Sequence, residues 1–203
     1  ITDGRDTAPK AGGEFVAALE QVMAKAGVGK ISTITGRYYA MDRDQRWDRT
    51  QRAYDALTQC KGRRVQDAQT FIAESYKTGT TDEFIEPGVI VDNSGKPVGP
   101  IIEDDSIVFF NFRADRVRQI TKALAFDDFT GFERQLRPTV HCATMTAYDA
   151  TFDLPVAFPP TVLSANLADV LADHKLRNLR LAETEKYAHV TYFFNSGEES
   201  PYK

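Results

Sequence analysis

The sequence predicts an α/β fold, a three-layer α/β/α sandwich with a mixed, partly parallel sheet and a small β-hairpin. Strand-like apolar runs alternate along the chain with segments whose apolar residues recur at helical spacing, a pattern typical of parallel strand pairing. One pair of short runs instead flanks a tight turn and indicates an antiparallel hairpin. With 203 residues, 42% of them hydrophobic, the chain can bury one sizeable core and part of a second.

The first half of the chain supplies three expected helices and three expected strands. Helical spacing is found over 15–26, ending at Gly27, over 47–60, and again over 65–72. Strands are expected at 31–35, 84–85 and 89–91. The residues Asn93-Ser94-Gly95-Lys96 then predict the hairpin turn.

The second half begins with a strand over 107–110 that changes to helical spacing from Val117. A loop is expected over 126–138 and a strand over 140–145. The proline-rich segment 148–160 is the best linker in the sequence. Beyond it we expect a helix around 167–171 and a strand at 179–182, followed by a strand-end cluster over 183–190.

Charge and composition exclude several classes of protein. The formal net charge of −4 argues against a nucleic-acid binder, which needs a basic face. The apolar runs are too short for a membrane span of about 20 residues. Cys60 and Cys142 form no metal or redox motif and are expected to be buried free thiols of a cytosolic protein. The chain starts and stops abruptly, as if cut from something longer.

Cationic residues recur where expected strands end. They are Arg5, then Arg37 and Arg43, then Arg113 and Arg116, and finally Lys186. Ligands bind at the carboxyl ends of strands in open α/β sheets, and guanidinium groups match the geometry of carboxylates and phosphates. If parallel strands bring these ends together, they form a site for a small, multiply charged anion. The competing interpretation is that Arg113 and Arg116 only pair with Asp104, Asp105 or Asp115 on the surface.

Four motifs in this order resemble cofactor-independent phosphoglycerate mutase, and they are spread over nearly the whole chain. They are Asp3-Gly4-Arg5-Asp6-Thr7, Thr35-Gly36-Arg37-Tyr38-Tyr39-Ala40-Met41-Asp42-Arg43, Phe110-Asn111-Phe112-Arg113-Ala114-Asp115-Arg116 and Ala182-Glu183-Thr184-Glu185-Lys186-Tyr187-Ala188-His189-Val190-Thr191. The resemblance implies an isomerase of glycolysis and gluconeogenesis, from the alkaline phosphatase superfamily, that interconverts 3-phosphoglycerate and 2-phosphoglycerate through a phosphoserine intermediate. It also implies two Mn²⁺ or Mg²⁺ ions in the full-length enzyme.

The resemblance further implies how this chain is divided. Residues 1–160 would be most of the inserted phosphotransferase, or substrate-binding, domain, lacking its N-terminal part. Residues 161–203 would begin the return into the metal-binding phosphatase-like domain. A hinge is expected near Phe158-Pro159-Pro160, because the two halves must close on the substrate and open again.

Carried over by motif, the substrate-binding residues would be Arg5, Asp6, Arg37, Arg43, Arg113, Arg116 and Lys186. Asp6 would accept a hydrogen bond from a glycerate hydroxyl or take part in proton transfer, although it also suits a turn-stabilising role. Lys186 would neutralise the transferring phosphoryl group, although a solvated lysine at a helix start is the simpler reading.

Other parts of the family's machinery have no match in this sequence. No stretch resembles the nucleophilic serine motif or the Asp/His metal cluster, and the substrate-binding histidine would lie before Ile1. His141, His174 and His189 lack ligand spacing and are expected to be structural. We therefore expect no catalytic nucleophile and no metal ligand in this chain, and no mutase activity from it alone.

Three alternatives remain open at this point. The first is another enzyme of the same metallophosphatase superfamily, such as a phosphopentomutase or a phosphonate hydrolase. The second is a stand-alone module that binds a phosphorylated acid without turnover. The third is a purely structural α/β domain. For the mutase we expect a cytoplasmic monomer with a small-molecule substrate and with neither a nucleic-acid nor a membrane partner.

Overall fold

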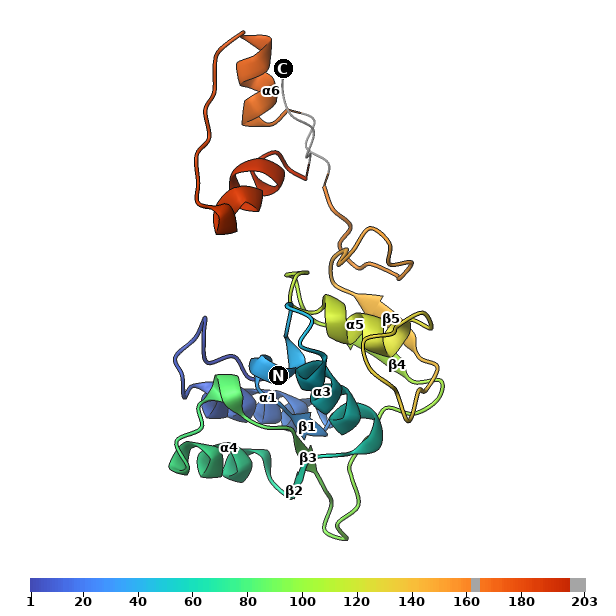
Figure 1. Cartoon of the computed structure of the whole chain (residues 1–203). Coiled ribbons are helices and arrows are strands. Elements are labelled where there is room, and N and C mark those ends of the chain that lie inside the picture. Colours follow the sequence, from blue (N-terminus) through green and yellow to red (C-terminus); the bar gives the residue numbers. More distant parts are fainter. Residues whose placement is uncertain (162–164, 198–203) are drawn as a thin grey trace. The chain divides into compact units, whose positions relative to one another are not determined.

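The computed structural model describes residues 1–161 and 165–197, and it separates into two compact units (Figure 1). The first unit runs from Ile1 to Phe158, and the second begins at Pro159. Helices and strands alternate through the first unit, and both parallel and antiparallel strand pairs occur in it. The predicted α/β class with mixed pairing is therefore confirmed.

One sheet of the first unit has three strands in the order β1-β3-β2. Strand β1 (Thr33–Ile34) runs antiparallel to β3 (Gly88–Ile90), whereas β2 (Arg63–Val65) runs parallel to it. The predicted hairpin turn follows β3, because Asp92 N donates to Lys96 O at 2.8 Å and Val91 forms an antiparallel bridge with Pro97.

Two helices, α1 (Gly12–Ala26) and α4 (Ala68–Lys77), belong to this part of the unit (Figure 1). Helix α1 ends as predicted at Gly27, which has a left-handed φ of 71°. Asp67 is the N-cap of helix α4, and its side chain accepts a hydrogen bond from Thr70 N at 2.6 Å. The local core consists of Ile34, Ala68, Phe71, Ile72, Ile85 and Ile90.

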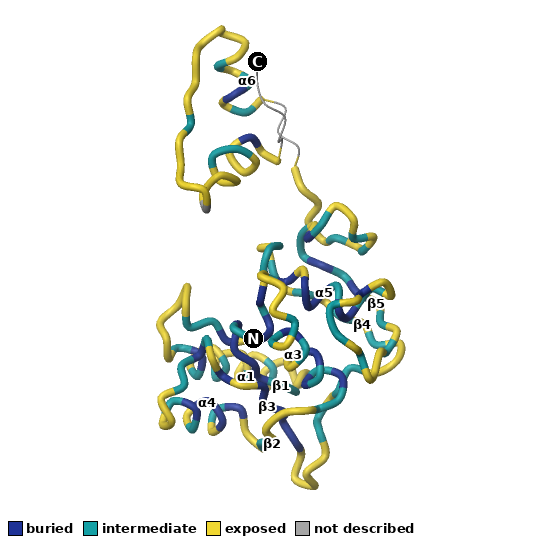
Figure 2. Tube along the Cα trace, viewed as in Figure 1, coloured by how far each residue is buried: buried dark blue, intermediate teal, exposed yellow. Residues whose placement is uncertain are grey.

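The second sheet pairs β4 (Ser106–Phe109) in parallel with β5 (His141–Thr144). Helices α2 (Arg37–Ala40), α3 (Trp47–Gln59) and α5 (Arg118–Ala125) surround the other core of the unit. Buried residues occur in each of these helices, and also in β3 and α4 of the other part of the unit (Figure 2). This core consists of Tyr39, Ala40, Ala53, Tyr54, Val117, Ile120, Ala123, Leu124, Phe129 and Tyr148.

Three details of the first unit differ from expectation. The expected strand at 84–85 is instead a 3₁₀ helix, η1 (Asp82–Phe84), because the buried Asp82 side chain must turn inward to accept hydrogen bonds. Val65 lies in β2 rather than in a helix. The helical apolar face of α1 is exposed at Phe15 (60%) and Val22 (64%), so this amphipathic helix does not bury its whole stripe here.

The second unit contains α6 (Leu167–Asp173), the 3₁₀ helix η2 (Thr184–Lys186) and the π-helix η3 (His189–Phe193). The predicted strand at 179–182 is wrong, since Leu179 and Leu181 are each 88% exposed and have no strand partner among the described residues. Between them Arg180 donates to Asn195 Oδ1 at 2.5 Å and to Val190 O at 3.2 Å. The residues of the expected strand-end cluster over 183–190 are helical from Thr184 onward.

The expected linker is anchored at its start. Tyr148 is 1% exposed and donates to Asn111 O at 2.6 Å, so it belongs to the core. Residues 155–158 then pair beside β5, with Ala157 N donating to Thr144 O at 2.9 Å. Both cysteines are free as predicted: Cys142 is buried, whereas Cys60 is only half-buried. No helix within the described residues is long and apolar enough to cross a membrane.

Candidate functional site

The first arginine motif forms a tight turn beside the second. Thr2 pairs in parallel with Gly36, which sends residues 3–7 and the start of α2 in the same direction. Gly4 has a φ of +66° and lies so near η1 that an added Cβ would be 2.7 Å from Glu83 N. Gly4 therefore has a left-handed conformation that favours glycine, and its close neighbour is another segment of the same chain.

Arg37 lies at the centre of this turn. Its side chain is only 7% exposed, and its Nη1 donates both to Asp3 Oδ1 and to Asp6 Oδ2, the latter at 2.7 Å. Burial by itself would lower the pKa of Arg37, but the bonds to Asp6 and Asp3 outweigh burial and raise it. Among the described residues, Arg37 Nε is buried and has no hydrogen-bond partner.

A second group joins Arg43 to Arg113 through the carboxylate of Asp115. Arg43 Nη1 and Arg113 Nε each lie 2.7 Å from an Asp115 oxygen. Burial would raise the pKa of Asp115, but the hydrogen bonds and charges of Arg113 and Arg43 outweigh burial and lower it. The surface-pairing interpretation was therefore right about Asp115, although the carboxylate also brings two of the predicted arginines together.

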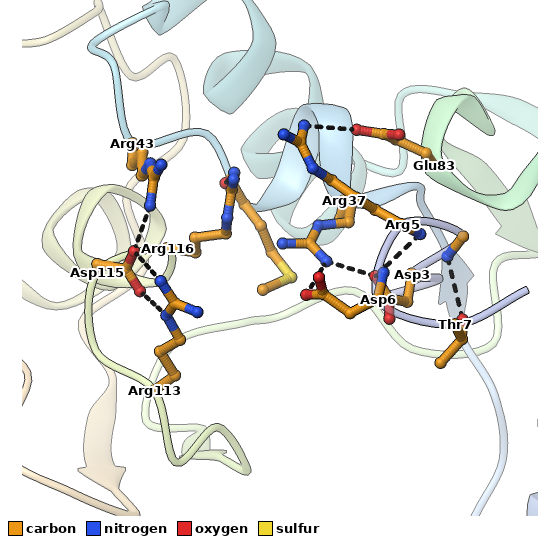
Figure 3. Close-up of polar contacts among 12 residues, drawn as sticks. Asp3, Arg5, Asp6, Thr7, Arg37, Arg43, Glu83, Arg113, Asp115 and Arg116 are labelled. Atoms are coloured by element: carbon orange, nitrogen blue, oxygen red, sulfur yellow. Dashed lines mark hydrogen bonds and ion pairs between the residues drawn. The ribbon is translucent and has the colours of Figure 1, made fainter. Parts of the chain in front are cut away.

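Arg116 lies between the two groups (Figure 3). Its Nη1 donates to Met41 O at 3.3 Å. Burial lowers the pKa of Arg116, and the positive charges of Arg37, Arg43 and Arg5 lower it further. A guanidinium whose pKa is depressed by neighbouring cations marks a local excess of positive charge, which a bound anion would neutralise.

The structure thus brings together all the predicted arginines of the first unit, here called the arginine cluster: Arg5, Arg37, Arg43, Arg113 and Arg116. Arg5, whose side chain is 59% exposed, is held loosely by Glu83 at 3.4 Å. Asp6 has a side chain 72% exposed, which leaves most of its carboxylate accessible. Lys186 is exposed and belongs to the second unit, so the structure does not join it to the cluster.

Sequence reasoning named Asp115 as a possible partner but missed the other acidic and amide groups that organise the cluster. Asp3 and Asp42 stand inside the quoted motifs, where their closeness to arginines was the available signal. Glu83 and Gln119 act on the cluster from other segments, with no sequence signal beyond their polarity.

The three histidines of the chain were expected to be structural. His141 and His174 are exposed, and His189 lies 5.5 Å from the ring of Phe193 between centroids. In the described part of the chain, no group of three or more His, Cys, Asp or Glu side chains could hold a metal ion.

The fold and its arginine cluster define an α/β domain that gathers guanidinium groups from separate motifs, and guanidinium groups are a type of group that pairs with anions. Residues 1–150 match the family described as BPG-independent PGAM N-terminus, and the chain belongs to that family.

Similar proteins agree with this assignment. The 2,3-bisphosphoglycerate-independent phosphoglycerate mutase 1 of Methanosarcina barkeri is 52% identical over 202 residues, covering 99% of this chain and 39% of the relative. The Moorella thermoacetica protein of that name is 49% identical, with 98% and 39% covered. Phosphoglycerate mutase from Leishmania mexicana, solved at low cobalt concentration, superposes with a TM-score of 0.80 at 32% identity, with 98% and 38% covered. The chain spans about two fifths of these relatives.

Proposed function

We propose that this chain is the substrate-gripping part of a 2,3-bisphosphoglycerate-independent phosphoglycerate mutase. The complete enzyme would interconvert 3-phosphoglycerate and 2-phosphoglycerate. The single observation that carries the proposal is the arginine cluster, in which Arg37, Arg43 and Arg113 from separate motifs are held by carboxylates on either side of Arg116. The family membership and the names of the relatives support it.

The proposed reaction moves the phosphoryl group from the 3-hydroxyl oxygen of glycerate to a serine, and from that serine to the 2-hydroxyl oxygen. No outside phosphate donor is needed. The serine and the two Mn²⁺ or Mg²⁺ ions would come from other parts of the complete enzyme. The domain assignment proposed for this chain places residues 1–160 in the inserted domain and 161–203 in the return segment. A cytoplasmic monomer is part of the same proposal.

In this chain the arginines would provide binding and orientation. Guanidinium groups donate in a planar fork, which suits both the carboxylate and the phosphate of phosphoglycerate. Orienting the glycerate while its phosphoryl group is on the serine would favour its return to either hydroxyl oxygen. Asp6, still largely exposed, would accept a hydrogen bond from the free hydroxyl or exchange a proton with it.

Lys186 would reach the phosphoryl group from the second unit. An ammonium group there would offset the charge that spreads over the transferring group. Its exposed position in the second unit leaves it available for such a contact.

Calorimetric titration with 3-phosphoglycerate, without metal, tests the proposal directly. The variant is Arg113→Ala, and the matched control is Arg63→Ala, another exposed arginine, paired to Glu74 at 2.5 Å outside the cluster. Loss of charge-assisted hydrogen bonds should weaken binding by about tenfold or more for Arg113→Ala. Arg63→Ala should bind as the wild type does.

The complete enzyme provides the second arm of this test. There, Arg113→Ala should raise the KM for 3-phosphoglycerate in a mutase assay, and Arg63→Ala should not. Equal effects of the two substitutions in both assays would contradict a substrate role for the arginine cluster.

A further inference from the structure

The loop that carries Arg43, residues 41–46, is organised around a buried carboxylate. The side chain of Asp42 is 3% exposed. Its Oδ2 accepts hydrogen bonds from Asp44 N at 3.0 Å, Arg46 N at 2.9 Å and the side-chain amide of Gln119 at 2.8 Å. A buried carboxylate needs such donors, since leaving it unpaired is costly. The loop therefore wraps around Asp42 Oδ2, and Gln119 reaches it from another helix.

Gln119 belongs to α5 and is 8% exposed. Its Nε2 donates to Asp42 Oδ2 at 2.8 Å and to Thr50 Oγ1 at 3.0 Å, which uses both amide hydrogens. Its Oε1 accepts from Gln45 N at 2.7 Å. Gln45 has a φ of 58°, a left-handed conformation that costs energy for a residue with a Cβ. One side chain thus fixes the loop at Asp42 and again at Gln45.

These two attachment points flank Arg43. On the other side of the loop, Arg43 Nη1 donates a hydrogen bond to Asp115 Oδ2 at 2.7 Å. Met41 O accepts a hydrogen bond from Arg116 Nη1 at 3.3 Å. Asp115, Arg116 and Gln119 follow one another closely at the start of α5, so the loop is held to that helix start over its whole length.

We propose that Gln119 is a positioning residue for the arginine cluster, one that holds the Arg43 loop against α5, beside Arg116, for binding of a phosphorylated acid. This inference rests on the proposed function for its ligand, although the attachment itself does not. Gln119 would touch no substrate. It would act through the backbone on either side of Arg43.

Glutamine is the side chain that this position requires. It offers two donors to two oxygens and one acceptor to a backbone N–H, and it carries no charge. Glutamate keeps the acceptor but places a second carboxylate against Asp42, where it has no proton to donate. Methionine keeps the length but leaves Gln45 N and one Asp42 bond without their partner.

The test compares Gln119→Glu with Gln59→Glu in the full chain. Gln59 is the matched control because its Nε2 also donates to an aspartate, Asp55 Oδ1, at 2.7 Å, outside the Arg43 loop. Two quantities are measured: hydrogen exchange of the Asp44, Gln45 and Arg46 amides without ligand, and calorimetric affinity for 3-phosphoglycerate. Thermal unfolding of each variant is recorded alongside.

Gln119→Glu should speed exchange of these three amides by tenfold or more and weaken 3-phosphoglycerate binding to a similar degree. Gln59→Glu should change neither quantity, whatever it costs in stability.

Unchanged exchange and affinity in Gln119→Glu would overturn the inference, as would equal losses in Gln59→Glu. If Gln119→Glu does not fold, Gln119→Met replaces it, with faster loop exchange and weaker binding again expected. A wild type that binds no phosphoglycerate would contradict the proposed function, and amide exchange would then decide the attachment independently.

Discussion

Arg37 Nη1 donates a hydrogen bond to Asp6 Oδ2 at 2.7 Å, which joins a guanidinium that is 7% exposed to a carboxylate that is 72% exposed. The pair links the first motif of the chain to the second. Asp6 therefore has two possible partners. Its carboxylate accepts a hydrogen bond from Arg37, and its exposed oxygens could also accept one from a hydroxyl group of the proposed substrate.

This pairing gives a prediction for Asp6→Ala. Removing an exposed partner should lower the free energy of unfolding by less than about 1 kcal/mol. Affinity for 3-phosphoglycerate should fall about tenfold, because its hydroxyl loses an acceptor. Inorganic phosphate, which has no glycerate hydroxyl, should bind as well as before or better, since a negative charge has left the cluster. Calorimetry with both ligands checks this, and parallel losses for both would contradict the hydroxyl role.

Asp115 gives a prediction about acid stability. Its pKa lies below the ordinary value of 3.8, so its contribution is present above that pH and is lost as the pH falls through its folded-state pKa. Asp115→Asn should therefore lower the free energy of unfolding by about 1 kcal/mol near pH 7. The difference from wild type should shrink below about pH 4.

Chemical unfolding between pH 7 and pH 3 measures this difference. Asp128→Asn is the control, because the Asp128 side chain is 75% exposed and lies 3.8 Å from its lysine partner. A gap between wild type and Asp115→Asn that stays constant across this range would contradict the assignment.

Tyr76 is bonded to a carboxylate that is wholly buried. Its hydroxyl donates to Asp82 Oδ1 at 2.5 Å, and Asp82 is 0% exposed. Burial and this bond raise the pKa of Tyr76 to about 12. Tyr76→Phe should lower the free energy of unfolding by about 1–3 kcal/mol, since Asp82 loses a donor. Tyr187→Phe, at a side chain 69% exposed, should have little effect in the same denaturant titration.

Gly36 permits the close approach of η1 to the start of α2. A Cβ there would lie 2.4 Å from Glu83 O, which is backbone and cannot turn aside. Gly36→Ala should therefore destabilise the first unit by about 1–3 kcal/mol and disturb Arg37, the next residue. Gly13→Ala is the control, because its Cβ would meet nothing nearer than 3.6 Å and alanine favours a helix. Thermal unfolding of both variants measures this difference in stability. Equal changes in the unfolding temperature of the two variants would contradict the prediction.

Much of the fold could be predicted from periodicity. Helices α1, α3 and α5 and strands β3, β4 and β5 fall where the apolar spacing placed them, and the hairpin follows β3. Local spacing could not identify η1, because Asp82 accepts a hydrogen bond from Gly12 N, which is 70 positions away in the sequence. The segment at 179–182 has strand composition, but a strand also needs a neighbour to pair with.

The arginines were predictable because they follow strand ends in several motifs at once. The side chains that hold these arginines in place were harder to predict. Asp115 stands next to an arginine in sequence, whereas Gln119 meets Asp42 across 77 positions. An amide on a helix gives no sign of its partner until the chain has folded.

The two thiols differ enough to be chemically distinct. Cys142 is buried, and burial raises its pKa to about 11, so it should resist alkylation. Cys60 is half-buried at the end of α3 and is the more accessible of the pair. One fluorophore could be attached to Cys60 and a second to a cysteine introduced at Leu179, which is 88% exposed. The pair would allow the distance between the two units to be followed. Energy transfer between the dyes would test the hinge expected near Phe158-Pro159-Pro160, because its opening or closing would change the distance between them.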